Sequence, residues 1–205
     1  MMKKNTFLLI AILILSCYQS ALPADTVSKL SYENSIEFKA IYKKAVDGIA
    51  EYQIQIADMY YRGKVIEQDY KKAFEWYQKA ADQGLDQAQI FLGIMYYKGA
   101  GVEQDYKKAF EWYKKLADQG MPYAQYLLGN MYYEGVFVKE DNKEAVKWLD
   151  KAAQQGNAAA QVKIGLMYYL GDGKPQNKQK ARSLISKAAE QGNNDAKRLM
   201  QELEW

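Results

Sequence analysis

The stretch Glu67–Tyr77 reads EQDYKKAFEWY, and the same eleven residues return as Glu103–Tyr113. The two copies lie 36 residues apart (103 − 67). An identical run at a fixed offset indicates an internal duplication, and a period of about 20–50 residues is typical of stacked repeats. The fold is therefore predicted from the repeat.

Several other residue types keep the same 36-residue spacing along the chain. They are Gly48, Gly84, Gly120, Gly156 and Gly192; Met59, Met95, Met131 and Met167; Tyr60–Tyr61, Tyr96–Tyr97, Tyr132–Tyr133 and Tyr168–Tyr169; Ala73, Ala109, Ala145 and Ala181; and Trp76, Trp112 and Trp148. The spacing needs no gap, so the structural unit has a fixed length. We expect the methionines and tryptophans to fill space between packed helices.

The first half of each unit has the pattern of a helix. In the second unit Ala88 and Leu92 recur at i and i+4, which places them on one helical face. Gly93 lies in the middle of this helix, where glycine costs about 1 kcal/mol relative to alanine. Its return as Gly129 and Gly165 predicts that a second helix approaches closely at this point.

The second half of the unit has the pattern of another helix. Asp105 is placed to cap its N-terminus. Ala109, Trp112 and Leu116 follow on one apolar stripe, and Gly120 is placed to end the helix. Each unit is therefore predicted to be an antiparallel pair of helices, and the fold class is all-α.

One such pair cannot bury its own apolar face, whereas stacked pairs can. The predicted organisation is an N-terminal capping helix in 25–48, four repeats in 49–192 (49–84, 85–120, 121–156 and 157–192) and a C-terminal capping helix in 193–205. We expect one helical run over Ser28–Asp47 and a last helix over Asp195–Glu204. In that last helix polar Gln201 replaces the mid-helix glycine, which suits the end of a stack.

The first 24 residues have the form of a secretory signal peptide. Lys3 and Lys4 precede the nine-residue apolar run Phe7–Leu15, which is too short to span a bilayer. Cleavage after Ala24 is one interpretation. In the other, the four residues that end at Cys17 resemble a bacterial lipoprotein signal, and Cys17 would be lipidated. Either way we expect an exported protein, in the periplasm, on the cell envelope or secreted.

Composition excludes several function classes. The formal charge of the chain is +3, and it becomes +1 once the two leader lysines are removed. This near-neutral balance gives no basic surface for nucleic acid. The chain has no His and a single Cys, so an intramolecular disulfide and His-based metal or triad chemistry are ruled out.

The repeated motif carries a family resemblance. In the third unit Ala124–Tyr132 reads AQYLLGNMY. In the first two units the corresponding segment is followed by a turn that contains Gly and by a helix that begins D-Y-x-K-A. This pattern resembles the Sel-1-like repeat (SLR) family, a relative of the tetratricopeptide repeat, over Ile49–Gly192. The resemblance implies a right-handed α-solenoid of antiparallel helix pairs with 36-residue repeats. The fourth unit departs from the pattern at Lys174, where the other units have Ile or Val, and at Leu184–Ile185.

The resemblance also implies a scaffold or adaptor that binds a protein or peptide partner in the concave groove, without catalysis. No cofactor and no small-molecule substrate are expected. Contact with a membrane would come only through a lipid anchor at Cys17. Bacterial members of the family are often exported, and some are lipoproteins.

Superposing the units on the tetratricopeptide pattern predicts which side of the first helix lines the groove. The positions are Glu51, Ile54, Asp58, Tyr61 and Arg62; Gln87, Ile90, Ile94, Tyr97 and Lys98; Tyr123, Tyr126, Asn130, Tyr133 and Glu134; and Ala159, Val162, Leu166, Tyr169 and Leu170. The candidate binding residues among them are Tyr61, Tyr97, Tyr133, Tyr169, Ile54, Ile90, Tyr126 and Asn130. An aromatic ladder suits peptide binding. The alternative is that these tyrosines pack in the seam between units with their hydroxyls in water.

Two other functions are weighed against the adaptor. One is a β-lactamase-like or cell-wall-related enzyme, as in a cysteine-rich branch of the family. This chain lacks the cysteines of that branch, has no Ser-x-x-Lys, and has no Ser, Thr, Cys or His between Ile36 and Arg182. An activated nucleophile therefore cannot be built there. The other is a secreted factor that acts on a host, which differs from the adaptor only in partner and location.

Overall fold

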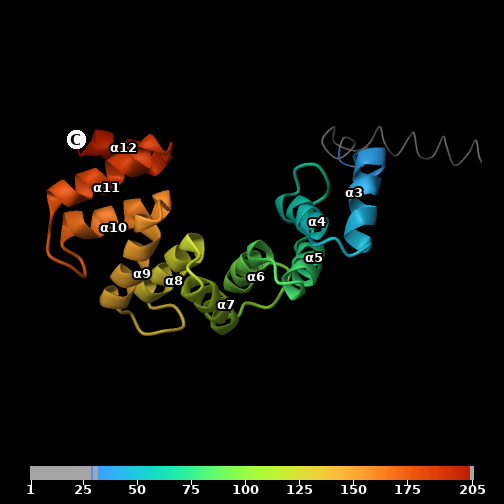
Figure 1. The fold of residues 1–205 in the computed structure, drawn as a ribbon, viewed down its shortest axis with the longest axis horizontal. Helices are drawn as coiled ribbons and strands as arrows, with labels where there is room; N and C mark the ends of the chain where they lie inside the picture. The colour runs from blue at the N-terminus through green and yellow to red at the C-terminus, as the bar shows by residue number, and fades with distance from the viewer. Residues whose placement is uncertain (1–28, 30–31, 204–205) are drawn as a thin grey trace, which may run out of the picture. The chain divides into compact units, whose positions relative to one another are not determined.

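The computed structural model describes residue 29 and residues 32–203 (Figure 1). This part of the chain contains helices and no strand, so the predicted all-α class is confirmed. The helices are α3 (Ile36–Val46), α4 (Ala50–Arg62), α5 (Tyr70–Asp82), α6 (Asp86–Lys98), α7 (Tyr106–Asp118), α8 (Pro122–Glu134), α9 (Asn142–Gln154), α10 (Ala158–Leu170), α11 (Lys178–Glu190) and α12 (Asn194–Glu202). The predicted signal peptide in residues 1–24 and the lipidation site Cys17 lie outside the described residues.

The chain divides into two compact units, which are described separately. The first ends at Leu85 and contains α3, α4 and α5. The second begins at Asp86 and contains α6 to α12, and within it each helix packs against the next one along the chain (Figure 1). Packing between neighbours in sequence is the physical basis of a solenoid.

The repeat unit is built from helices of equal length. From α4 to α11 every helix has 13 residues, and each pair begins its second helix at the same point of the 36-residue period. Asp105 caps α7 by accepting a hydrogen bond from the Lys108 backbone N–H over 3.0 Å, as predicted. Gly120 follows that helix with a φ of +93°, a conformation that costs glycine little.

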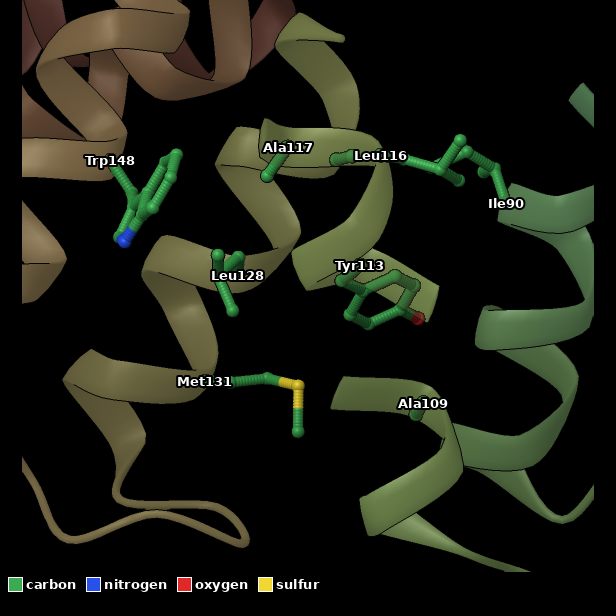
Figure 2. Close-up of a cluster of buried hydrophobic side chains, with 9 residues drawn as sticks. Ile90, Ala109, Tyr113, Leu116, Ala117, Leu128, Met131 and Trp148 are labelled. Carbon is green, nitrogen blue, oxygen red and sulfur yellow. The ribbon is translucent and has the colours of Figure 1, made fainter. Parts of the chain in front are cut away.

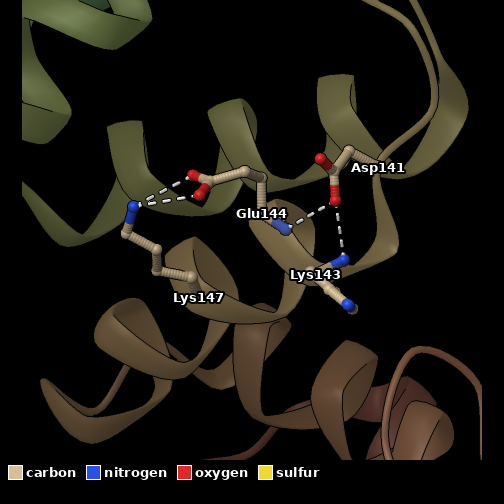
Figure 3. Close-up of polar contacts among 4 residues, drawn as sticks. All are labelled: Asp141, Lys143, Glu144 and Lys147. Atoms are coloured by element: carbon tan, nitrogen blue, oxygen red, sulfur yellow. Dashed lines mark hydrogen bonds and ion pairs between the residues drawn. The ribbon is translucent and has the colours of Figure 1, made fainter.

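Figure 3 shows the corresponding cap of α9. One oxygen of Asp141 accepts from the backbone N–H groups of Lys143 and Glu144, each over 3.0 Å. The Glu144 carboxylate pairs in turn with Lys147 one turn along the helix. The carboxylate thus satisfies two backbone donors that a helix N-terminus leaves without intrahelical partners.

The mid-helix glycines allow the close approach that the sequence predicts. A Cβ atom on Gly129 would lie 2.8 Å from Leu149 Cγ, and one on Gly165 would lie 2.7 Å from Ile185 Cγ1. Both distances are shorter than carbon atoms tolerate. Glycine therefore sets how closely the two helices of a repeat can pack.

The core of the second unit includes a cluster on α6, α7, α8 and α9 (Figure 2). Its members are Ile90, Ala109, Tyr113, Leu116, Ala117, Ala124, Leu128, Met131 and Trp148. Met131 and Trp148 are 1% and 5% exposed, as their predicted packing role requires. Burying one large apolar side chain of this kind is worth about 1.5–3 kcal/mol.

A buried glutamine in the first helix of each repeat is a structural element that the sequence analysis missed. Gln125 Nε2 donates to the Ala117 carbonyl over 3.2 Å, and Gln125 Oε1 accepts from Gln155 Nε2 over 2.8 Å. Gln161 makes the same two bonds one repeat later, to Ala153 and from Gln191. Because an amide both donates and accepts, one side chain can join helices on either side of it.

The two ends of the array differ from expectation in small ways. The predicted helical run from Ser28 is wrong, because Ser35 is extended (φ −65°, ψ 152°) and its Oγ accepts from the Phe38 N–H over 3.1 Å. This cap starts α3 at Ile36. At the other end α12 ends at Glu202, and Gln201 is exposed as predicted.

The divergent turn of the fourth repeat keeps its structure through an ion pair. Lys174 stands where the other repeats have a branched apolar residue, and its side chain is only 9% exposed. Its Nζ lies 2.9 Å from Asp150 Oδ2 and 3.9 Å from the centre of the Tyr168 ring. The buried ammonium is therefore compensated by a carboxylate and by an aromatic face.

Candidate functional site

A pocket opens on α6 and α8 in the second unit. Its volume is about 270 Å³, and we call it the tyrosine pocket. It is lined by Tyr97, Tyr113, Tyr123, Tyr126, Leu127, Asn130, Met131 and Glu134. Five of these residues belong to the predicted groove side of the first helices: Tyr97, Tyr123, Tyr126, Asn130 and Glu134.

The periodicity of α8 explains why it supplies most of the lining. Counted from Tyr123, the residues Tyr126, Leu127, Asn130 and Glu134 lie at i+3, i+4, i+7 and i+11, which share one face of a helix. A side chain from α6 and another from α7 complete the wall. The floor is apolar, because Tyr113 and Met131 also belong to the core cluster of Figure 2.

A hydrogen bond closes one side of the pocket. Tyr97 Oη donates to Glu134 Oε2 over 3.2 Å. Burial raises the pKa of the Tyr97 phenol above its ordinary value, and the charge of Glu134 and the hydrogen bond to it act in the same direction. The phenol therefore stays protonated at neutral pH and remains a donor.

Two stacked rings form the outer wall. The rings of Tyr123 and Tyr126 have their centres 6.1 Å apart and their planes inclined by 22°. Tyr123 is 44% exposed, so part of this aromatic surface faces solvent. Such rings offer a large contact area at a small cost in side-chain entropy.

The most informative atom in the pocket is Asn130 Oδ1. It is buried, and no hydrogen-bond donor reaches it within the described part of the chain. A buried acceptor without a donor costs about 1–3 kcal/mol, and such atoms are rare in native proteins. Asn130 thus brings to the pocket lining a buried acceptor whose bonding capacity is unused, and a ligand with an N–H or O–H group would reach it after a small turn of the side chain.

On the same face of α4, in the first unit, Asp58 and Arg62 are already paired. A hollow of about 310 Å³ there is lined by Gln55, Asp58, Met59, Arg62, Lys64 and Val65. Asp58 stands at the repeat position of Asn130, and it accepts from Tyr77 Oη and pairs with Arg62, each over 2.9 Å. The tyrosine pocket is therefore the better candidate for a ligand.

The other predicted tyrosines are half-buried and engaged in local contacts. Tyr61, in the first unit, packs edge-on against Tyr70 with ring centres 5.3 Å apart. Tyr133 Oη donates to Asp172 over 2.9 Å, and Tyr169 lies under the Lys178 ammonium at 5.4 Å. The structure places Tyr133 and Tyr169 outside the tyrosine pocket. Their predicted binding role stays a prediction.

The two predicted isoleucines occupy the interior. Ile54 is 8% exposed and Ile90 is 4% exposed, and Ile90 belongs to the core cluster of the second unit. Their assignment to an open groove wall is therefore corrected, because this position faces into the packing. In the third repeat the larger Tyr126 holds the same position and is half-buried on the pocket wall.

The described residues include no group of three His, Cys, Asp or Glu side chains that could hold a metal ion. No helix there is both long enough and apolar enough to cross a bilayer. The groups that line the tyrosine pocket suit stacking and hydrogen bonding.

Comparison with known proteins gives a consistent result. The family model of the Sel1 repeat matches the chain four times, at residues 50–85, 86–121, 122–157 and 158–193. Each match begins one residue after a predicted repeat boundary, with the predicted period. No curated protein sequence matches the chain significantly.

Solved structures that are similar to this chain agree with the match to the Sel1 repeat. A protective antigen with an SLR fold, present in uropathogenic Escherichia coli strains, is 41% identical over 79% of this chain, with a TM-score of 0.70. A Sel1 repeat protein from Oxalobacter formigenes is 40% identical over 80%, with a TM-score of 0.65. This chain spans 35% and 47% of those two chains.

A more distant structure shows the fold alone. Cysteine-rich protein B of Helicobacter pylori is 21% identical over 64% of this chain and 97% of its own length, with a TM-score of 0.53. Together these likenesses confirm the predicted solenoid of helix-pair repeats.

Proposed function

This chain belongs to the Sel1 repeat family, whose members are in general scaffolds for protein interactions, and we propose that it binds a protein or peptide partner on the helix face that carries the tyrosine pocket. The lining of this pocket includes a residue with a buried polar atom that has no partner among the described residues. The proposal is an adaptor without catalysis.

The observation that carries this proposal is the buried and unpartnered Asn130 Oδ1 in a pocket whose outer wall includes the exposed ring of Tyr123. A structure that only had to be stable would gain from an apolar residue there, as the repeats before and after it show with Ile94 and Leu166. An extended peptide brings backbone N–H donors and side chains together, so it would satisfy the amide and cover the rings.

The absence of catalysis is proposed from the residue types available. Between Ile36 and Arg182 the sequence has no hydroxyl of Ser or Thr, no thiol and no imidazole. The pocket offers one carboxylate and the Tyr97 phenol, which donates a hydrogen bond to that carboxylate. These groups support recognition better than group transfer.

Export is the second part of the proposal. It rests on the basic residues and the short apolar run before Ala24. The similar Escherichia coli protein is described as a protective antigen, which suits a protein outside the cytoplasm. The mass of the mature protein from its host tests this: a chain that starts at Asp25 indicates soluble export, an acylated Cys17 indicates a lipoprotein, and an uncleaved Met1 contradicts export.

The binding proposal is tested by selecting peptides from a random display library on the purified chain. Peptides that bind the wild type should be retained poorly by the double variant Tyr97→Ala/Tyr126→Ala, which removes two pocket walls. The control is Lys71→Ala/Lys107→Ala, a pair of exposed changes outside the pocket lining. Equal retention by all three folded proteins would contradict binding at this face.

A further inference from the structure

We infer that the tyrosine pocket receives the guanidinium group of an arginine side chain carried by the partner. This inference rests on the proposed protein-binding function and names the chemistry that the pocket recognises. The acceptors, the rings and the charge of the pocket support it.

Two side chains of α8 supply hydrogen-bond acceptors to the pocket lining. Asn130 and Glu134 lie four residues apart on α8, so their side chains emerge on the same face about 5–6 Å apart at Cβ. Glu134 brings a carboxylate, and Asn130 brings an oxygen that has no donor in the described structure. A guanidinium group carries five N–H donors in a planar fork, so one group can bond the carboxylate and, once the Asn130 side chain turns toward it, the amide oxygen as well.

The rings favour the same ligand. The nearly parallel rings of Tyr123 and Tyr126 give a flat aromatic wall, and Tyr97 gives a further ring beside Glu134. A planar, weakly hydrated cation stacks on such faces. A lysine ammonium is compact and strongly hydrated, so it would give up more hydration for fewer contacts.

The charge of the pocket is negative. Its lining residues include Glu134 and no lysine or arginine. At the same repeat position the first two repeats have Arg62 and Lys98, and the fourth has Leu170, so the acidic residue is specific to this pocket. The charge is therefore complementary to a cation.

The charge of Glu134 acts on one lysine of the protein, Lys163. Lys163 is half-buried on α10, and burial lowers the pKa of its ammonium, while the charges of Glu134 and Asp172 oppose that effect. Its Nζ lies 3.7 Å from the centre of the Tyr133 ring. Among the described ion pairs Glu134 has no cationic partner, so its carboxylate remains able to bind one from outside.

The size of the pocket agrees with a single side chain. Its volume of about 270 Å³ is just below the range of about 300–1,000 Å³ that is usual for sites of drug-sized molecules. The remaining contacts of the partner would then lie outside the pocket, along the exposed face of the helices. The arginine would act as an anchor of the kind that dominates protein interfaces.

The test uses three short probes that differ only in the central residue: acetyl-Gly-Arg-Gly-amide, its lysine counterpart and its citrulline counterpart. Citrulline keeps the shape of arginine and loses the charge and one donor edge. Binding to the purified full chain is followed by nuclear magnetic resonance of the Met131 methyl group, which lies in the pocket floor. We expect the arginine probe to saturate at about millimolar concentration, and the other two to bind about tenfold more weakly or less.

Two variants make the test specific. Glu134→Gln keeps the size of the side chain and should weaken binding of the arginine probe about tenfold. The matched control Glu111→Gln, on the exposed face of α7, should leave this affinity unchanged. Asn130→Leu should weaken the probe severalfold and yet raise the midpoint of urea unfolding, because it removes the orphan acceptor. A purely structural role for Asn130 would not move binding and stability in opposite directions.

Several results would overturn the inference. They are equal binding of the arginine and citrulline probes, equal or tighter binding of lysine, an unmoved Met131 methyl signal, and an unchanged arginine affinity in Glu134→Gln. The wider function has its own separate readout. Display-selected peptides that need Tyr97 and Tyr126 but are indifferent to Glu134→Gln would leave protein binding in place and remove only the arginine.

Discussion

Tyr97 of the second repeat donates a hydrogen bond to Glu134 of the third, with 3.2 Å between Oη and Oε2. One repeat later Tyr133 donates to Asp172 over 2.9 Å. The two acceptors hold different repeat positions, because Asp172 lies 38 residues after Glu134 (172 − 134). Both tyrosines thus do more than fill a seam, because each donates to a carboxylate of the next repeat, and the Tyr97 bond holds Glu134 on the face that we propose for binding.

The cap of α9 gives a stability prediction (Figure 3). Asp141→Ala should lower the free energy of unfolding by about 0.5–2 kcal/mol, because two backbone N–H groups lose their acceptor. Asp141→Asn keeps an acceptor oxygen and should cost only a fraction of that. Urea unfolding followed by circular dichroism measures both. Equal losses for the two variants would show that the charge, and not the hydrogen bonds, stabilises this end.

The close approach at Gly129 gives a prediction for a double-mutant cycle. Gly129→Ala gains about 1 kcal/mol of helix propensity but forces a Cβ to within 2.8 Å of Leu149 Cγ, which costs about 1–3 kcal/mol. We expect a net loss of stability. In a Leu149→Ala background the contact is gone, so the same change should become neutral or stabilising. Additive effects of the two changes would contradict the steric explanation.

The buried glutamine gives a third prediction. Gln125→Leu should lower stability by about 1–3 kcal/mol, because the buried Ala117 carbonyl loses its donor and the Gln155 amide loses an acceptor. Gln154→Leu, on the exposed side of α9, is the matched control and should be nearly neutral. A Gln125→Leu protein as stable as the wild type would show that these bonds are replaced by water.

The pH dependence of stability gives a fourth prediction. Burial raises the pKa of the Tyr77 phenol, with further increases from the Asp58 charge and the hydrogen bond to it. A raised folded pKa means that the associated stability is complete below the unfolded value of about 10 and is lost at higher pH.

We therefore expect the free energy of unfolding to be lower at pH 11 than at pH 9, because the loss sets in near the unfolded value of about 10 and continues above it. Tyr77→Phe should flatten this fall, and comparison of the two proteins cancels the common effect of lysine deprotonation. Unfolding curves in urea at both pH values measure the slopes. Identical slopes would mean that Tyr77 does not contribute to alkaline unfolding.

The repeat made most of the fold predictable. A strict 36-residue spacing located the helix pairs. Gly93, Gly129 and Gly165 predicted a close helix–helix contact, because glycine is costly within a helix. The start of α3 was missed because the Ser35 cap depends on local backbone geometry, which an amphipathic pattern does not reveal.

The candidate site was only partly predictable. Sequence phase placed Tyr97, Tyr126 and Asn130 on one face, and the structure brings them to one pocket. Phase alone could not distinguish Ile90, which is buried, from Tyr126 at the same repeat position, because exposure there depends on side-chain size and on the neighbouring helix. The missing donor at Asn130 is likewise visible only in three dimensions.

The most direct test of the account is a calorimetric titration of the best display-selected peptide into the purified chain. We predict that Tyr97→Ala/Tyr126→Ala raises the dissociation constant by about tenfold or more, which is a loss of about 1.4 kcal/mol or more of binding free energy. Lys71→Ala/Lys107→Ala should leave the dissociation constant unchanged. An unchanged dissociation constant in the folded pocket variant would contradict the claim that this face binds the partner.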